Sequence, residues 1–490
     1  MTETLQTPAE EALAGAELGP FEAGLRGELI RPGDPGYEEA RQVFNGMVDK
    51  RPALIVRCAG GADVISAVRF ARESGLLVAV RGGGHNVAGS AVCGGIVIDL
   101  SQMKGVWIDP ATGTARVEPG VTWGEFNHDL QAFDLGATGG YISTTGVPGL
   151  TLGGGLGWLM SKHGLACDNL RSADVVTADG RFLRASESEN ADLFWGLRGG
   201  GGNFGIVTSF EFGVHPVGTV LAGLLVYPLA AAGELLTFFR AYAQIAPDEL
   251  TSGVLLLTAP RVPFVPEPAQ GMPVCAVTLL YAGPPAEGER VLRPLREFRP
   301  PLVDLVQPMP YAAAQCMADD FFPAGLRHYW KSSYLRSLGD DAINTLVTRF
   351  ETVPAANDHD RRATRRRGRP HRPGRDRLPA TLSNLQLPRH LDVDRPRRRR
   401  AEHRLDARAR RRDGALHERR RIRELPRRRR PGARQISVRN RAVRATRRAQ
   451  EPVRPDQLLP PQPEHQARPM KSSIRARNRL RIPFKQGGTR

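Results

Sequence analysis

Three runs of glycine constrain this chain more than any other feature of its sequence. They are Gly82–Gly84, Gly153–Gly157 (interrupted by Leu156) and Gly199–Gly202. Because glycine has no Cβ, such runs allow positive φ and let neighbouring N–H groups surround an anion. One run alone is more often an ordinary turn, and none lies in the setting of a Rossmann or Walker A motif. Several runs in one chain therefore indicate a large diphosphate cofactor held by main-chain atoms from several sides.

His85 directly follows the first glycine run, and the apolar residues 76–80 before this run predict a short buried strand. A side chain in this position would face a ligand that lies along the loop. A single histidine is more often structural than functional, but the neighbouring glycine loops favour a role for His85 in the cofactor site.

Hydrophobic periodicity divides the region after residue 50 into two units. The first unit is predicted to contain helices at 63–74 and 123–133 and strands at 76–80, 96–100, 114–118, 174–177, 181–184 and 206–212. The second is predicted to contain strands at 220–227, 253–258 and 274–281, helices at 231–245 and 286–298, and a proline-rich loop at 260–273. The second pattern is typical of an antiparallel sheet backed by helices, which suits a domain that covers a substrate. The predicted fold class is α+β.

Four segments, in this order along the chain, resemble the p-cresol methylhydroxylase-type FAD-binding domain, and more closely the berberine bridge enzyme-like group of FAD-linked oxidases. They are Arg81–Asn86 (RGGGHN), Gly146–Leu159 (GVPGLTLGGGLGWL), Gly164–Asn169 (GLACDN) and Asp192–Val207 (DLFWGLRGGGGNFGIV). Tyr329–Ser332 (YWKS) is similar to a segment of the family's substrate domain. The resemblance implies an N-terminal segment at 1–47, a two-subdomain FAD-binding domain at 48–217 and a truncated antiparallel-sheet substrate domain at 218–355.

The resemblance also implies that His85 carries FAD covalently through its imidazole, by a bond to a ring methyl of the flavin. Some family members add a second bond from a cysteine, but no cysteine lies between Cys93 and Cys167, so single attachment is expected. The residues expected to contact FAD, carried over from matching motif positions, are Arg81, Gly82, Gly83, Gly84, His85, Asn86, Gly89, Ser90, Thr144, Thr145, Gly149, Gly153, Gly154, Gly155, Gly157, Asp168, Asn169, Gly205, Ile206 and Val207.

In such oxidases hydride passes from a small organic substrate to the flavin, and O2 then accepts the electrons and yields hydrogen peroxide. The protein supplies orientation and electrostatics, and the flavin supplies the redox chemistry. The expected partners are therefore a small-molecule substrate and O2, without a metal. The base of the family is commonly a tyrosine or glutamate late in the chain, near a VYVNY-type segment. No such segment occurs in this sequence, so the catalytic residue is unknown.

The last 140 residues differ sharply in composition from the rest of the chain. Residues 1–350 carry a net charge of −11, whereas residues 351–490 carry +29, nearly all of it from arginine. Phe484 is the sole aromatic residue of this second segment. So few large apolar groups cannot offset the conformational entropy lost on folding. The C-terminal 135 residues, 356–490, are therefore predicted to be a disordered, low-complexity tail.

The tail also has the properties of a shifted reading frame. Suppose that the DNA encoding Gln450–Arg468 (QEPVRPDQLLPPQPEHQAR) uses GC-rich codons and is read one base later. It can then encode an ending similar to the family's terminal RYDPxNFFRxNQNI segment. The same shift lets Leu416–Arg427 encode FMSGGVYVNYLG, which contains the tyrosine segment, and Met470–Lys471 forces a stop codon. We therefore hypothesise a one-base slip near Pro354–Asn357, which would have removed the family's tyrosine base.

Two other functions are compatible with parts of the sequence. A dehydrogenase or reductase of the same fold would use FAD without passing electrons to O2. An Arg-rich nucleic-acid-binding protein would use the tail to contact phosphates. The tail, however, has almost no lysine and lacks the aromatic side chains on which bases stack, so nucleic acid is not an expected partner.

The remaining features concern location. No apolar run approaches the roughly 18 residues that cross a membrane, and the acidic N-terminus lacks the features of a secretory signal. The five cysteines are scattered without a C-x-x-C pair. A disulfide framework or zinc site is therefore not expected, and the reducing cytoplasm is the expected location.

Overall fold

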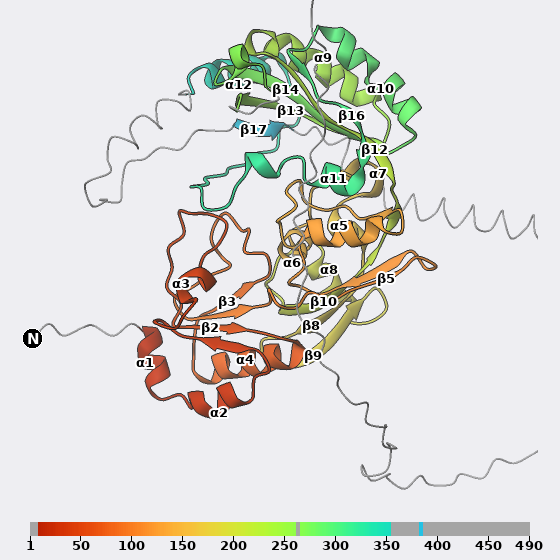
Figure 1. The fold of residues 1–490 in the computed structure, drawn as a ribbon. Coiled ribbons are helices and arrows are strands. Elements are labelled where there is room, and N and C mark those ends of the chain that lie inside the picture. Colours follow the sequence, from red (N-terminus) through yellow and green to blue (C-terminus); the bar gives the residue numbers. More distant parts are fainter. Residues whose placement is uncertain (1–7, 261–264, 354–381, 386–490) are drawn as a thin grey trace, which may run out of the picture. The chain divides into compact units, whose positions relative to one another are not determined.

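The computed structural model describes residues 8–260, 265–353 and 382–385 (Figure 1). The chain separates into two units, Met1–Arg398 and Arg399–Arg490, and all described residues belong to the first. The predictions for residues 356–490 therefore lie outside the described residues, except for one strand, β17 (Leu382–Leu385). The first unit contains sheets of four, five and six strands with helices between them, which confirms the predicted α+β class.

The first sheet consists of three parallel strands and one antiparallel strand at its edge. Its order is β1 (Glu28–Ile30), β2 (Leu54–Arg57), β4 (Ile96–Asp99) and β3 (Val78–Arg81). Strand β4 pairs in parallel with β2 and with β3, so these strands end at one edge, where the first glycine run leaves β3. The helices of this part are α1 (Pro8–Ala14), α2 (Leu18–Ala23), α3 (Tyr37–Ala40) and α4 (Gly61–Glu73).

The second sheet is antiparallel throughout. Its order is β5 (Val106–Asp109), β6 (Thr114–Val117), β10 (Ile206–Gly213), β8 (Leu170–Val176) and β9 (Phe182–Ser186). The helical segments are α5 (Trp123–Gln131), α6 (Val147–Leu152), α7 (Met160–His163), the 3-10 turn η1 (Ala166–Asn169) and α8 (Ala191–Leu197). A capping box between Thr122 and Glu125 fixes the start of α5, and the helix buries Trp123 and Phe126 against Phe212.

The third sheet belongs to the substrate domain and is also antiparallel, as predicted. Its strands are β12 (Thr219–Pro228), β13 (Leu250–Thr258), β14 (Pro273–Tyr281), β15 (Val303–Asp304), β16 (Gln307–Pro310) and β17. Its helices are α9 (Ala232–Ile245), α10 (Pro285–Phe298), α11 (Tyr311–Gln315) and α12 (Asp340–Glu351), with 3-10 turns η2 (Leu229–Ala231), η3 (Glu267–Ala269) and η4 (Asp319–Phe321).

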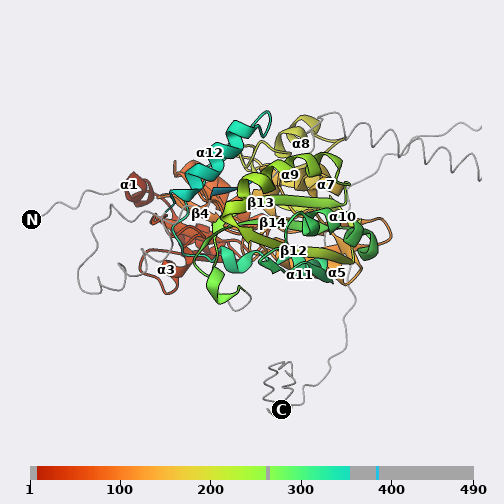
Figure 2. The ribbon, with the colours of Figure 1, turned by 90° about the horizontal axis from the view of Figure 1, so that it is seen from above.

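The two faces of the third sheet have different neighbours. Helices α9, α10 and α12 cover one face (Figures 1 and 2), where Leu225, Phe239 and Phe350 share one core. The other face packs Ala222 and Leu280 against residues that precede α7, in a core that includes Trp158 and α11. A two-stranded sheet pairs β7 (Leu135–Gly136) with β11 (His215–Pro216), and β11 lies just before β12 in the chain.

The helices predicted at 63–74, 123–133, 231–245 and 286–298 are confirmed as α4, α5, α9 and α10 within two residues at each end. The first sheet begins upstream of the predicted domain start at Val48, because β1 pairs with β2. The domain boundaries themselves stay predictions.

Three further properties bear on function. In the part of the chain that the structure describes, no helix combines the length and the apolar character that a bilayer crossing requires. The same residues contain no cluster of histidine, cysteine and acidic side chains placed to hold a metal ion. All five cysteines are free thiols, and of these only Cys316 is exposed.

Candidate cofactor site

The loop that follows β3 and the loop that precedes α6 meet backbone to backbone. A Cβ built on Gly83 would lie 2.5 Å from the Gly146 nitrogen, and one built on Gly146 would lie 2.5 Å from the Gly83 nitrogen. A Cβ on Gly82 would lie 2.5 Å from the Pro148 ring. Close-packed protein interiors leave no room for such approaches, so only glycine fits at these positions.

The loop after β3 also presents main-chain donors. Among the described residues, no protein acceptor is found for the amide groups from Gly82 to Asn86. Gly84 has φ of +66°, which turns the chain at the middle of this row. Since backbone donors normally find partners, a row of free amides in a turn suits a ligand that offers acceptor oxygens, such as a diphosphate. In this respect the residues present fit FAD.

The second glycine run lies just after α6 and is equally restricted. Gly154 and Gly155 have φ of +110° and +90°, and a Cβ on Gly155 would lie 2.5 Å from that of Ala166. A Cβ on Gly157 would lie 1.7 Å from the Gly139 carbonyl oxygen. The run therefore brings two further loops into backbone contact.

His85 is in contact with both sides of the site. Its ring stacks on that of Phe44, with centroids 3.7 Å apart and planes inclined by 19°. Its Nε2 lies 3.3 Å from the hydroxyl of Thr144, in the loop before α6. Burial lowers the pKa of His85 to about 4, and nearby His328 adds to this effect. The imidazole is therefore neutral at pH 7, and a neutral ring keeps a nitrogen lone pair that can form a covalent bond.

Aromatic side chains from the substrate domain complete the surroundings of Phe44. The His328 ring stacks on Phe44, with centroids 4.5 Å apart. Phe44 therefore stacks with two histidine rings, those of His85 and His328. Trp330 contacts Phe44, His328 and Phe322 edge-on. Trp330 lies in the Tyr329–Ser332 segment, but sequence reasoning identified neither Phe44 nor His328. The Asn45-Gly46 pair, a turn signal, was the available local sign of this loop.

Arg81 uses its side chain within the protein. The guanidinium forms an ion pair with Asp99 (3.0 Å) and donates to the carbonyl groups of Ala40 and Gln42. It thereby holds the chain that leads to Phe44. A contact between Arg81 and FAD, which stays a prediction, would have to come from its main chain.

Asp168 and Asn169 lie in η1, and their side chains also bind protein groups. Asp168 accepts from the Leu165 amide (2.9 Å). Asn169 donates to the carbonyl groups of Leu165 and His163, and its Oδ1 lies 2.6 Å from Nε2 of His215. These two predicted residues therefore shape the segment after the second glycine run, and their contacts with FAD stay predictions.

The other predicted residues fall into three groups. Ile206 and Val207 are buried at the start of β10, where Gly205 has φ of +141°. A tight turn follows His85, in which the side-chain oxygen of Asn86 accepts from the Ser90 amide (3.3 Å). Residues near α6 make up the third group, namely Thr145, Gly149 and Gly153. Their contacts with FAD stay predictions.

Tyr311 on α11 is a buried tyrosine that is not placed to act as a base. It is fully buried, and its hydroxyl donates to the Ala137 carbonyl (3.0 Å). Burial raises its pKa far above the usual range.

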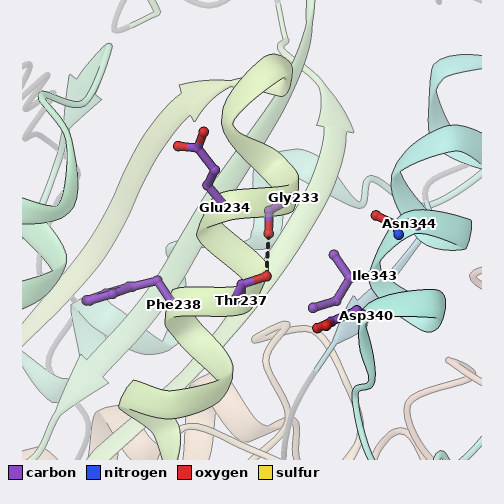
Figure 3. A pocket seen from close by; sticks show the side chains of 7 residues that line it. All are labelled: Gly233, Glu234, Thr237, Phe238, Asp340, Ile343 and Asn344. Carbon is purple, nitrogen blue, oxygen red and sulfur yellow. Dashed lines mark hydrogen bonds between the residues drawn. The ribbon is translucent and has the colours of Figure 1, made fainter.

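A surface groove lies between α9 and α12, apart from the residues of the cofactor site. It is lined by Glu234 and Phe238 on α9 and by Ile343 and Asn344 on α12, and Figure 3 shows the Glu234 and Phe238 side chains pointing away from α12. Thr237 bonds back to the Gly233 carbonyl (2.9 Å), so its hydroxyl is already used. None of the predicted FAD-contacting residues lines this groove.

Sequence comparison finds relatives that are named as FAD-linked or FAD-dependent enzymes. Residues 52–186 match the FAD binding domain family. The chain is 33% identical over 338 residues to an FAD-linked oxidoreductase of Dictyostelium discoideum, a match that covers 68% of this chain and 72% of the relative. It is 38% identical over 240 residues to (R)-6-hydroxynicotine oxidase of Paenarthrobacter nicotinovorans, covering 46% of this chain and 52% of that enzyme.

Solved structures agree with these relatives. 6-Hydroxy-D-nicotine oxidase from Arthrobacter nicotinovorans superposes with a TM-score of 0.60 at 28% identity, covering 68% of this chain and 73% of the other. A carbohydrate oxidase from Microdochium nivale gives 0.58 at 26% identity, covering 68% and 73%. The berberine bridge enzyme-like 1 protein of Physcomitrella patens, at 22% identity, shows the same fold with a TM-score of 0.59, covering 71% and 75%. The chain belongs to the family of FAD-linked oxidoreductases.

Proposed function

We propose that this chain is an FAD-dependent oxidase that takes hydride from a small organic substrate and passes the electrons to O2. We further propose that a single covalent bond from His85 holds the FAD. The observation that carries the proposal is the position of His85, which directly follows the first glycine run, has a neutral ring, and contacts Thr144 in the loop before α6 as well as Phe44. The two similar solved enzymes are named oxidases, which favours O2 as acceptor over the dehydrogenase alternative.

The proposed division of labour follows from the residues present. Bound FAD would supply a two-electron acceptor that can react with O2. The amide groups of Gly82–Asn86 and the loop 144–157 would hold the diphosphate and the ribityl chain. Phe44 would keep water from one face of His85. The backbone of Ile206 and Val207 would contact the flavin or the adenine.

The substrate class is left broad. One similar enzyme is named for a hydroxynicotine and another for a carbohydrate, so the fold does not select one chemistry. A cytoplasmic location also belongs to the proposal, and the free thiol state of all five cysteines supports it.

We also propose that the encoded C-terminus results from a one-base slip near residues 354–357. The match to the Dictyostelium relative covers 68% of this chain, which is about the share that precedes the slip. Among the described residues, no side chain is assigned as the proton acceptor, and the shifted frame would restore the tyrosine segment. The chain as encoded should therefore turn over little substrate, whereas the frame-corrected chain should be yellow and active.

The experiment compares these two forms after resequencing of the coding DNA. Each is purified, its flavin content is read from the visible spectrum, and peroxide is measured with a panel of sugars, alkaloids and polyketide alcohols. Flavin reduction with peroxide formation supports an oxidase. Flavin reduction without peroxide supports the dehydrogenase or reductase, and salt-dependent duplex binding without flavin supports the nucleic-acid binder. Equal oxidase rates in the two forms would contradict the proposed slip.

A further inference from the structure

Asn45 joins three segments of the chain close to His85. Its side chain is only 2% exposed. Nδ2 donates to the carbonyl groups of Val87 (2.7 Å) and His328 (2.8 Å), and Oδ1 accepts from the His328 amide (2.9 Å). Asn45 therefore ties the turn after His85 to a substrate-domain segment that is 283 residues away in sequence. Loss of this side chain would leave buried main-chain groups without partners.

The backbone beside Asn45 reinforces this junction. The Gly46 amide donates to the Leu326 carbonyl (2.7 Å), and the Gly325 amide donates to the Phe44 carbonyl (2.9 Å). A Cβ built on Gly46 would lie 2.2 Å from the Gly325 carbonyl oxygen, so the two chains touch directly. Phe44, on which His85 stacks, is thus fixed by the substrate domain.

Asp319 makes a second junction on the other side of His85. Its Oδ1 accepts from the Ser143 amide (2.7 Å), and its Oδ2 accepts from the Ser143 hydroxyl (2.5 Å). Bonds to a carboxylate are stronger than those between neutral groups. Thr144, whose hydroxyl lies next to His85, is the next residue in the chain. Asp319 therefore fixes the loop that provides the polar contact of His85.

Both junctions come from the segment 319–328, and each fixes one of the two side chains that contact His85. We propose that Asn45 and Asp319 are positioning residues, which hold the imidazole of His85 in the orientation that the covalent bond to FAD requires. The inference rests on the proposed attachment of FAD to His85. It adds that attachment depends on the substrate domain, although His85 lies in the FAD-binding domain.

The bond in question forms between a ring nitrogen of His85 and the carbon of a flavin ring methyl. The nitrogen and the methyl carbon each lose one hydrogen. The two electrons and two protons removed pass to O2, which becomes hydrogen peroxide. Asn45 and Asp319 take no part in this balance. Their effect is on the fraction of time that the nitrogen points at the reacting carbon.

The test uses the full-length chain, as encoded and frame-corrected, with Asn45→Ala and Asp319→Ala and with two measurements. In the flavin-free chain, diethyl pyrocarbonate labels neutral histidine, and peptide mass spectrometry gives the rate for His85 alone. After FAD is added, flavin fluorescence in a denaturing gel gives the rate of covalent attachment. We expect each variant to label His85 faster and to attach FAD about tenfold more slowly, which corresponds to about 1.4 kcal/mol in the barrier.

Three controls separate positioning from general damage. Asp320→Ala removes the neighbouring exposed carboxylate, which forms neither junction, and should match the unsubstituted chain. Asp319→Asn keeps an acceptor for the Ser143 amide and a donor for its hydroxyl, so it should restore most of the attachment rate. Labelling of His163, which stacks on His215 within the FAD-binding domain, should rise only if that domain opens as a whole.

The outcomes distinguish the two proposals. If the variants label His85 and attach FAD at the unsubstituted rates, the positioning role is wrong. If His163 labelling rises in step with His85, the effect is general unfolding and the positioning role is again wrong. A third outcome is that the unsubstituted, frame-corrected chain binds FAD only non-covalently, while the two variants still show selectively faster labelling of His85. In that case the proposed attachment is wrong, but Asn45 and Asp319 do fix His85.

Discussion

The first and third glycine runs differ in what surrounds them. At Gly82 a Cβ would collide with Pro148 in the first turn of α6, and at Gly83 it would collide with the backbone of Gly146, just before α6. At Gly199 and Gly202, after α8, a Cβ would meet nothing within 4 Å, although Gly199 has φ of +123°. A Cβ on Gly200 would lie 2.5 Å from the Gly196 carbonyl oxygen, a clash within the same segment and not with another loop. The first run is therefore glycine because two loops touch there. In the third run, the backbone freedom of glycine serves mainly to turn the chain after α8.

This contrast shows why the first run marks a site. At Gly83, close packing excludes a side chain, so the main-chain amides of this loop lie next to the loop that contains Gly146. His85 lies next to this contact. At Gly202, by contrast, no other loop of the described chain lies within reach of an added side chain. Because Gly83 and Gly202 both have ordinary φ, the comparison between them isolates packing from backbone conformation.

The largest expected effect is that of Gly83→Ala. The added methyl has no free volume at Gly146, so the two loops must separate at a cost of about 3 kcal/mol in the free energy of unfolding. The Gly83→Ala variant should also retain less FAD through purification. Thermal denaturation and flavin content of the purified variant measure the two effects. A variant that keeps both would show that the loops do not meet as described.

An intermediate effect is expected in the pH dependence of stability. The folded pKa of His85 is about 4, below its ordinary value near 6.5. Above about pH 6.5 the ring is neutral in both states. As the pH falls from there toward 4, only the unfolded chain gains the proton, so stability is lost. After allowance for the partly exposed ring, we expect His85→Phe to remove about 1–2 kcal/mol of this loss. Urea denaturation of the two flavin-free proteins between pH 7 and about 4 measures it, and parallel curves would refute a dry environment for His85.

The smallest effect is expected for Gly202→Ala, the matched control for Gly83→Ala. Its Cβ would enter open space at an ordinary φ, so the free energy of unfolding should change by no more than about 0.5 kcal/mol. Flavin content should be unchanged. A loss similar to that of Gly83→Ala would mean that the two runs have equivalent roles, contrary to the contrast drawn above.

Local signals allowed most elements around the site to be predicted. The apolar faces of α4 and α9 and the alternation of β10 follow from periodicity, and the glycine run after β3 pointed to His85. Elements without a strong period, such as the four-residue strand β2 and the short helix α11, were not predicted.

The side chains that fix His85 could not be predicted in the same way. Asn45 contacts His328, and Asp319 contacts Ser143, across separations that no local pattern encodes. Asn45 also lies upstream of the expected domain start at Val48. Arg81 shows the converse, because its motif position suggested a ligand and its side chain binds Asp99.

The covalent bond proposed between His85 and FAD can be detected in a single peptide. The frame-corrected protein is denatured, washed free of unbound flavin and digested, and the peptide that contains His85 is weighed by mass spectrometry. We expect a yellow peptide whose mass is increased by one FAD less two hydrogens, with the modification on His85. A colourless His85 peptide of unmodified mass, from protein that bound FAD before denaturation, would contradict it.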